Sequence, residues 1–348
     1  MSTDPKKQSS QKALERIQRR KQNSSSIQDL FLSIKSGSIK SLSEGITLCE
    51  SSKTDDQRNA AELLQLCAPH SGNSLRIGIT GVPGVGKSTL IEAFGKSWIA
   101  DGHKVAVLAV DPSSQKSKGS ILGDKTRMES LSVDPNAFVR PTPANESLGG
   151  VAARTREAII LCETAGFDVV LVETVGVGQS EIAVKSMVDF FLLLMLSGAG
   201  DELQGIKRGI MEMADGIAIT KVDGDNFKKA KRAMGELKNA LHLFPVSEND
   251  WYPDVMLTSA YQETGLLELK ENIRSFFTKM NDSKWIEKQR SQQNLYWFKS
   301  MLNSMAMIYL EQQKELESQL PIIEKAVKDQ ELDPQLALKK VQEILGLN

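Results

Sequence analysis

Short runs of apolar residues alternate with longer amphipathic stretches through the middle of this chain. Six of these runs are rich in aliphatic side chains and predict strands: Leu75–Thr80, Val105–Val110, Val169–Thr174, Phe190–Leu196, Gly216–Thr220 and Val255–Thr258. They are apolar throughout rather than at every second position, which is typical of a parallel sheet covered by helices on both faces. The pattern therefore predicts a doubly wound α/β domain with a mainly parallel sheet.

The two ends of the chain have a different pattern. Residues 1–70 are polar and rich in serine, with helical spacing of apolar residues in places. In the C-terminal part, apolar residues recur every three or four positions: Leu295, Phe298, Leu302, Met305, Tyr309, Leu316 and Leu320. We expect a long amphipathic helix whose stripe packs on the same chain or on a second copy, and which Pro321 ends before a last helix. The predicted organisation is a polar, partly helical extension over 1–70, the α/β domain over 71–282 and a helical region over 283–348.

Composition limits the functional classes open to the chain. Its 348 residues are 40% hydrophobic and 25% charged, the balance of an ordinary globular protein. A formal net charge of −1 argues against a general nucleic-acid-binding protein, because neutralising phosphates needs a surplus of Lys and Arg. No apolar stretch approaches the roughly 20 residues that span a bilayer, so we expect no membrane segment. Cys49, Cys67 and Cys162 are far apart and odd in number, which favours a cytoplasmic protein in a reducing environment.

The first chemical motif directly follows the strand predicted over 75–80. Gly81-Val82-Pro83-Gly84-Val85-Gly86-Lys87-Ser88 matches the phosphate-binding pattern G-x-x-x-x-G-K-[ST], and a helical run begins at Thr89. We expect the N–H groups of this loop to converge on the β-phosphate, with the helix N-terminus adding its positive end. Lys87 would contact the β- and γ-phosphates as a catalytic residue, and Ser88 would bind Mg²⁺. A nucleotide-binding P-loop is therefore the interpretation.

Three carboxylates near strand ends are candidate magnesium ligands. Asp111 follows the second predicted strand, Asp124 lies in a glycine-containing segment beyond it, and Glu173 ends the third strand. The carboxyl ends of parallel strands share a sheet edge with the P-loop, and Mg²⁺ prefers oxygen ligands. We expect Asp111 and Glu173 to assist catalysis, with Glu173 acting through water, and Gly176 to offer its N–H to the γ-phosphate. Alternatively, Asp111 caps a turn and Asp124 is a solvated loop residue.

The segment Thr220–Asp223 directly follows the fifth predicted strand and has the form of a base-recognition motif. The Asp223 carboxylate can accept two hydrogen bonds, from N1–H and the 2-amino group of guanine, whereas adenine offers no such pair of donors. We expect the stem of Lys221 to lie along the base. After the last predicted strand, Ser259-Ala260-Tyr261 would offer a backbone N–H to guanine O6, although this segment alone also fits an ordinary helix start.

Several longer motifs occur in a fixed order along the chain: Gly81–Thr89, Ala109–Ser114, Gly119–Met128, Glu173–Glu181 and Gly198–Gly205. Together they resemble the family of MeaB, ArgK and the human methylmalonic aciduria type A protein. The resemblance is strong over roughly residues 50 to 280 and looser over the helical C-terminus. Two positions depart from the family, since Thr220 stands where Asn is usual and Ser197 where Pro is usual.

The resemblance implies a GTPase of the SIMIBI class that binds GTP and GDP with Mg²⁺ and forms a homodimer through its C-terminal helices. It also implies a chaperone of adenosylcobalamin-dependent methylmalonyl-CoA mutase or a related acyl-CoA mutase. Such a chaperone gates cofactor loading and protects or reactivates the mutase. By the same resemblance, Asp111, Asp124 and Glu173 serve the magnesium site, and residues 196–207 relay the nucleotide state to the partner.

Other functions remain open at this stage. A SIMIBI GTPase can insert a metal or serve another partner, and a nucleotide-dependent scaffold would have negligible turnover. Metal delivery typically goes with His or Cys tracts, whereas the three histidines here are scattered: His70, His103 and His242. The older description of part of this family as a transport kinase finds no support, because no H-R-D-x-x-x-x-N catalytic loop is present.

Overall fold

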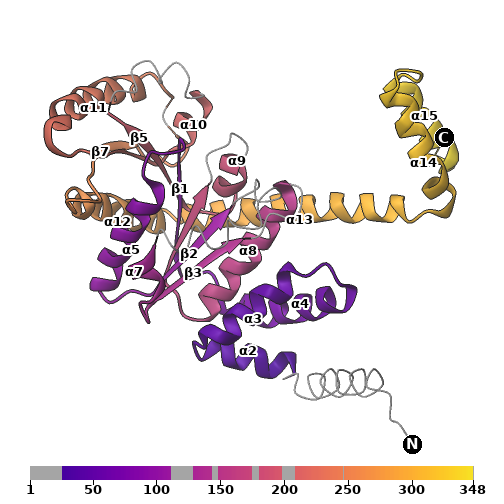
Figure 1. The fold of residues 1–348 in the computed structure, drawn as a ribbon, viewed down its shortest axis with the longest axis horizontal. Coiled ribbons are helices and arrows are strands. Elements are labelled where there is room, and N and C mark those ends of the chain that lie inside the picture. Colours follow the sequence, from indigo (N-terminus) through magenta and orange to yellow (C-terminus); the bar gives the residue numbers. More distant parts are fainter. Residues whose placement is uncertain are drawn as a thin grey trace, which may run out of the picture. The chain divides into compact units, whose positions relative to one another are not determined.

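The computed structural model of the protein describes residues 26–110, 128–142, 148–174, 180–197, 208–245 and 247–347. The chain divides into two compact units, residues 1–289 and residues 290–348. The first unit holds the sheet, and the described part of the second is helical (Figure 1).

Seven strands form one parallel sheet in the first unit, in the order β3-β2-β4-β1-β5-β6-β7 (Figure 1). They are β1 (Leu75–Gly81), β2 (Val105–Val110), β3 (Ala137–Thr142), β4 (Val169–Thr174), β5 (Phe190–Leu196), β6 (Gly216–Thr220) and β7 (Asp254–Leu257). The predicted doubly wound α/β class is confirmed, and the described strands of this sheet pair in parallel throughout rather than mainly so. The strand β3 was not predicted.

Helices cover both faces of this sheet (Figure 1). On one face lie α5 (Lys87–Ala100), α7 (Glu129–Ser132) and α12 (Leu266–Asp282). On the other lie α9 (Ser180–Lys185), α10 (Arg208–Met213) and α11 (Phe227–Leu241), with α8 (Leu148–Thr164) beside α9. This two-sided cover explains why the strands are apolar at successive positions.

The strand β5 shows how one strand serves both halves of the core. Phe190, Leu192 and Leu194 belong to the cluster that contains the buried side of α5 and α12. Leu193 and Met195, which point the opposite way, belong to the cluster under α10 and α11. All five side chains are buried, so the centre of the sheet is a rigid base for the loops at its edges.

In the described residues from 26 onward, three helices precede the sheet: α2 (Ile27–Lys35), α3 (Ile39–Glu50) and α4 (Thr54–Cys67), followed by the short 3₁₀ turn η1 (Ala68–His70). Ser26 and Asp29 form a capping box at the start of α2, which fixes where that helix begins. All three helices contact α8. The expected helical N-terminal extension is therefore present, and it is docked on the α/β domain.

The C-terminal helices are α13 (Trp285–Glu311), α14 (Lys314–Lys328) and α15 (Pro334–Ile344). The expected break at Pro321 is wrong, because that residue lies inside α14. The long helix ends earlier, at Glu311, and Gln313 is the N-cap of the next. Proline removes only one backbone donor from α14, and most of the residues around it, such as leucine, glutamate and lysine, are good helix formers.

Candidate functional site

The P-loop connects β1 to α5 through backbone conformations that require glycine. Gly81 has φ +153°, and a Cβ atom there would lie 2.7 Å from the carbonyl oxygen of Leu194. Gly86 has φ +101° and is the N-cap of α5. Residues with a Cβ adopt such angles rarely, so these positions explain the glycine spacing of the motif. The loop lies between a strand and a helix N-terminus, as a phosphate site needs.

Lys87 is folded against the loop that precedes it. Its Nζ donates to the carbonyl oxygens of Gly81 at 2.8 Å and Val82 at 3.3 Å. Burial lowers the pKa of Lys87 below its usual value, while the negative charges of Glu173 and Glu181 oppose that shift. The ammonium group therefore lies within the curve of the loop, in electrostatic reach of two acidic side chains.

Ser88 and Glu173 bring two oxygen atoms together beside the loop. The Ser88 hydroxyl donates to Oε1 of Glu173 over 3.2 Å, and Glu173 is buried at the end of β4. Asp111, Asp124 and Gly176, the other residues predicted for this part of the site, lie outside the described residues. In the part of the chain that the structure describes, no three His, Cys, Asp or Glu side chains gather as a metal site.

The base-recognition segment is fastened directly to the P-loop. The Thr220 hydroxyl donates to the carbonyl oxygens of Val85 at 2.6 Å and Met195 at 3.2 Å. Nζ of Lys221 donates to the carbonyl oxygen of Gly84 at 2.7 Å. Thr220, which departs from the Asn usual in the family, thus makes a buried contact that joins β6 to the phosphate loop.

Asp223 lies against the turn that follows β7. Its Oδ1 accepts a hydrogen bond from the hydroxyl of Ser259, a fully buried residue. The backbone of Ser259 exchanges hydrogen bonds with Thr264, at 3.0 and 3.1 Å, which closes the turn. Tyr261 stands out from this turn with 88% of its surface exposed. The turn therefore positions Ser259 against Asp223.

A cavity of about 270 Å³ lies where these segments meet. It is lined by Val85, Gly86, Thr89, Leu90, Thr220, Lys221, Asp223, Ala260 and Tyr261. Residues of three separately predicted segments thus surround one space, near the lower end of ligand-pocket volumes. Ser88 and Glu173 meet beside the P-loop and are not among the residues that line this cavity.

Sequence reasoning missed Asn226, which contacts the base-recognition segment, and Ser197, which contacts Asn226. The side chain of Asn226, at the end of the 3₁₀ turn η4 (Gly224–Asn226), donates to the carbonyl oxygen of Lys221 at 2.8 Å. The Ser197 hydroxyl donates to Oδ1 of the same asparagine at 2.6 Å. The turn sequence that follows Asp223 was the available signal for Asn226, whereas nothing in the sequence links Ser197 to this segment.

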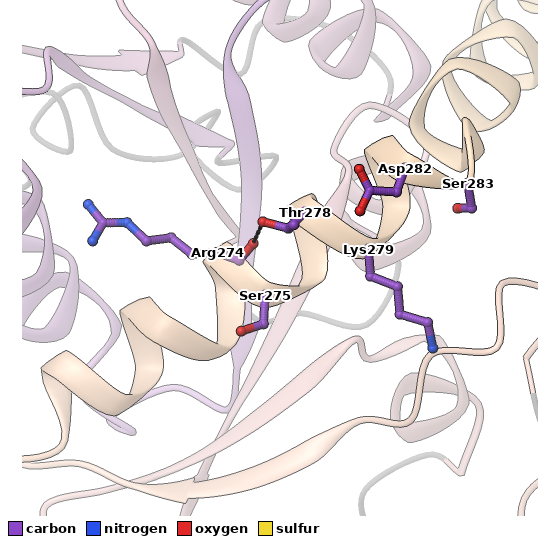
Figure 2. A pocket seen from close by; sticks show the side chains of 6 residues that line it. All are labelled: Arg274, Ser275, Thr278, Lys279, Asp282 and Ser283. Atoms are coloured by element: carbon purple, nitrogen blue, oxygen red, sulfur yellow. Dashed lines mark hydrogen bonds between the residues drawn. The ribbon is translucent and has the colours of Figure 1, made fainter.

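A second hollow, of about 690 Å³, lies on α12 and is lined by Arg274, Ser275, Thr278, Lys279, Asp282 and Ser283 (Figure 2). Its two basic side chains have structural partners. Arg274 pairs with Asp101 at 2.7 Å, and Lys279 donates to the carbonyl oxygen of Asp250. None of the residues predicted for the functional site lies here.

Comparisons with known proteins agree on one family. The family described as "Methylmalonyl Co-A mutase-associated GTPase MeaB" matches residues 42–315. A probable GTPase of Mycobacterium tuberculosis is 44% identical over 321 residues, covering 92% of this chain and 96% of the relative. The mitochondrial methylmalonic aciduria type A homolog of Mus musculus is 43% identical, covering 88% of this chain and 76% of the relative.

A solved structure supports the same fold. The crystal structure of a LAO/AO transport system kinase superposes with a TM-score of 0.74 at 36% identity, covering 93% of this chain and 99% of that chain. Among the helices that the structure describes here, none is both long and apolar enough to cross a membrane.

Proposed function

This chain belongs to the MeaB family of GTPases, and from that premise we propose that it is a nucleotide-controlled chaperone of an adenosylcobalamin-dependent acyl-CoA mutase. The chain is a GTP hydrolase and binds guanine nucleotides, as its named relatives indicate. Methylmalonyl-CoA mutase is the proposed partner, because the family description names it. In this role the chain gates cofactor loading and protects or reactivates the mutase.

The proposal for the nucleotide site rests on the contacts between the P-loop and the base-recognition segment. Thr220 and Lys221 contact the carbonyl oxygens of Val85 and Gly84, so the two segments hold each other at one cavity. In the proposed complex, residues 81–89 bind the phosphates and Asp223 accepts hydrogen bonds from guanine. A carboxylate that accepts from two guanine donors disfavours adenine, which would leave these acceptor positions of Asp223 without a donor.

The turn at 259–261 completes the proposed base site. Ser259 donates to Asp223, which leaves the carboxylate with further acceptor positions for the base. Ala260 and Tyr261 line the cavity, where a backbone N–H would meet guanine O6. The stem of Lys221 would lie along the base.

Phosphate chemistry is assigned to the residues at the carboxyl ends of β1 and β4. Lys87 would leave the carbonyl oxygens of its own loop for phosphate oxygens and neutralise charge as it develops on them. The oxygens of Ser88 and Glu173 suit Mg²⁺, which neutralises phosphate charge when bound and takes only a few ligands from protein. We propose Asp111 and Asp124 for the same magnesium site, with Asp111 and Glu173 assisting catalysis, and Gly176 for the γ-phosphate.

Residues 283–348 are proposed to form the homodimer contact. Among the described side chains of α13, eight large apolar ones are 45–65% exposed in the single chain: Leu295, Tyr296, Phe298, Met301, Leu302, Met305, Met307 and Tyr309. Such a run is costly to leave in water, and a second copy would cover it. The cytoplasm is the proposed location, since Cys49, Cys67 and Cys162 are buried free thiols.

The test uses methylmalonyl-CoA mutase purified from the organism that makes this chain, after its cofactor has been removed. Transfer of adenosylcobalamin to the mutase is followed by absorbance, with the full-length chain present or absent and with either GTP or GDP. We expect the transfer rate to depend on which nucleotide the chain carries. Identical rates in all four mixtures would contradict the chaperone role while leaving the GTPase activity intact.

A further inference from the structure

Two side chains from distant parts of the sequence form a hydrogen-bonded chain that ends on the base-recognition segment. Ser197, which directly follows β5, donates its hydroxyl to Oδ1 of Asn226 at 2.6 Å. Nδ2 of Asn226 then donates to the carbonyl oxygen of Lys221 at 2.8 Å. The end of β5 is therefore connected to the segment that carries Asp223.

The second of these bonds selects the orientation of the amide. An asparagine side chain presents an acceptor on one side and two donors on the other. Because the carbonyl oxygen of Lys221 can only accept, the amide nitrogen faces it, and the amide oxygen accepts from the Ser197 hydroxyl. A flipped amide would place two acceptor oxygens against each other. Ser197 thus holds the Asn226 side chain in place through a second hydrogen bond at its amide oxygen.

The backbone at Lys221 needs such support. Its φ is +57°, in the left-handed region that is unfavourable for a residue with a Cβ. The conformation is held by the contact of its ammonium group with Gly84 and by the bond from the N–H of Val222 to the carbonyl oxygen of Thr258, at 3.2 Å. Asn226 is the side chain that binds the Lys221 carbonyl itself, two residues before Asp223.

We propose that Asn226 is a positioning residue for guanine recognition, and that Ser197 anchors its side chain. Asn226 acts through the backbone of Lys221, which fixes the direction in which Asp223 meets the base. Guanine specificity therefore depends on the end of β5 as well as on Asp223. This inference rests on the proposed role of Asp223 in reading the base.

The experiment compares GDP with inosine diphosphate, which lacks the 2-amino group that Asp223 is expected to bind. Affinities of both are measured by calorimetry for the unmodified chain and for Asn226→Ala, Ser197→Ala and Ser197→Thr. Asn239→Ala, an exposed asparagine on α11, is the matched control. Thermal unfolding of each variant separates loss of positioning from loss of fold.

We expect Asn226→Ala to lower the GDP-to-IDP affinity ratio about tenfold, the upper range for one hydrogen bond. Ser197→Ala should lower it roughly threefold, because the Asn226 amide then loses one of its two hydrogen bonds and is held less firmly. Ser197→Thr, which keeps the hydroxyl, and Asn239→Ala should match the unmodified ratio.

Three outcomes would overturn the proposal. An unchanged ratio in Asn226→Ala, or equal losses for GDP and IDP with a lower unfolding temperature, would show that Asn226 has no role or only a structural one. An unchanged ratio in Ser197→Ala would remove Ser197 from the account. If the unmodified chain does not discriminate GDP from IDP, and Asp223→Asn does not change its preference, the base assignment itself is wrong.

Discussion

Both edges of the sheet carry acidic residues, but the contacts of the polar side chains differ between the two edges. At the amino edge, Asp168, Asp189 and Asp215 directly precede β4, β5 and β6. At the carboxyl edge, Glu173 lies at the end of β4 and Asp223 follows β6. Acidic residues therefore occur at both ends of β4 and β6, in different surroundings.

The amino edge is built from contacts within the scaffold. Asp215 accepts from Nζ of Lys185 at 2.5 Å and from the N–H of Phe191 at 2.8 Å. Burial raises the pKa of Asp215, and the charge of Lys185 opposes that shift. Asp168 accepts from His103 and from the N–H of Lys104, both at 2.8 Å. These carboxylates tie the start of one strand to a neighbouring element.

At the carboxyl edge, polar side chains instead contact the glycine-rich backbone of the P-loop. Lys87, Thr220 and Lys221 all donate to carbonyl oxygens of the P-loop. These contacts surround a cavity and lie at the N-terminus of α5, where anions are stabilised. The comparison teaches that the surroundings of a charged residue, rather than its type, separate a structural pair from a binding site. Substitutions at the two edges should therefore affect different properties.

The largest effect is expected from Asp223→Asn at the carboxyl edge. The amide replaces an acceptor with a donor, which suits the extra carbonyl of xanthine and opposes guanine. We expect the ratio of GTP to XTP affinity to fall by roughly 10⁴. Calorimetry with GTP, XTP and ATP measures it, and Asp282→Asn, on an exposed position of α12, is the control. Comparable ATP and GTP binding by the unmodified chain would rule out the base assignment.

Lys87→Ala should remove most of the catalytic rate. Loss of an ammonium group that neutralises phosphate charge is expected to slow GTP hydrolysis about 10³-fold. The fold should persist, because Lys87 is a buried cation whose contacts are to loop carbonyls. Single-turnover hydrolysis is the measurement, with Lys96→Ala, an exposed lysine of the same helix, as control. Equal rates for both variants would exclude Lys87 from the chemistry.

Glu163→Gln tests the amino edge, where an effect on stability alone is expected. Glu163 accepts from Nε and Nη2 of Arg76 at 2.8 and 2.9 Å, from Ser74 at 2.5 Å and from the N–H of Gly72 at 2.7 Å. Breaking a buried ion pair costs about 3 kcal/mol of unfolding free energy. Hydrolysis per folded molecule should not change. A lower rate with unchanged stability would show that the two edges are not separate in function.

The pH dependence of the same variant has a defined sign. Burial raises the pKa of Glu163, but the hydrogen bonds and charge of Arg76, with those of Ser74 and Gly72, bring it below the usual value. A carboxyl with a lowered folded pKa stabilises the fold above its unfolded pKa, near 4.3, and loses that effect as the pH falls through the folded pKa. The stability difference between Glu163→Gln and the unmodified chain should therefore shrink below about pH 4. A constant difference from pH 7 to pH 3 would contradict the ion-pair account.

Thr220→Val should have the smallest effect, at the carboxyl edge. It keeps the shape of the side chain and removes the hydroxyl that binds Val85 and Met195. We expect a loss of about 1 kcal/mol in unfolding free energy and roughly a threefold weaker affinity for GDP. Denaturant unfolding and calorimetry measure the two. If affinity is unchanged while stability falls, the bond holds β6 in place without shaping the nucleotide site.

The strands that could be predicted are those buried on both faces. The strand β3 was missed because it is the edge strand and contains Arg140 and Pro141. Proline lacks a backbone donor and is tolerated only where no neighbour needs one, so the local pattern there is weak. The expectation that proline interrupts regular structure also misplaced the helix break at Pro321, because that residue lies inside α14.

Motifs local in sequence could be placed, whereas contacts between distant segments could not. The P-loop glycines and the strand before them lie within a dozen residues, so their geometry follows from the sequence. The bond from Thr220 to Val85 joins residues 135 positions apart, and that from Ser197 to Asn226 joins residues 29 apart. Thr220 and Ser197 both depart from the residues usual in the family. Only the fold shows which distant residues they contact, and therefore whether each substitution weakens the site or supplies a new contact.

The most direct test of the account is single-turnover GTP hydrolysis by the full-length chain, with and without purified methylmalonyl-CoA mutase. A chaperone that uses GTP as a switch must have different affinities for the mutase in its GTP and GDP states. We predict a slow intrinsic rate that rises at least tenfold with the mutase, and rates about 10³-fold lower for Lys87→Ala under either condition. The assay uses concentrations at which the two proteins bind each other. If the mutase then leaves the hydrolysis rate unchanged, the central claim is contradicted.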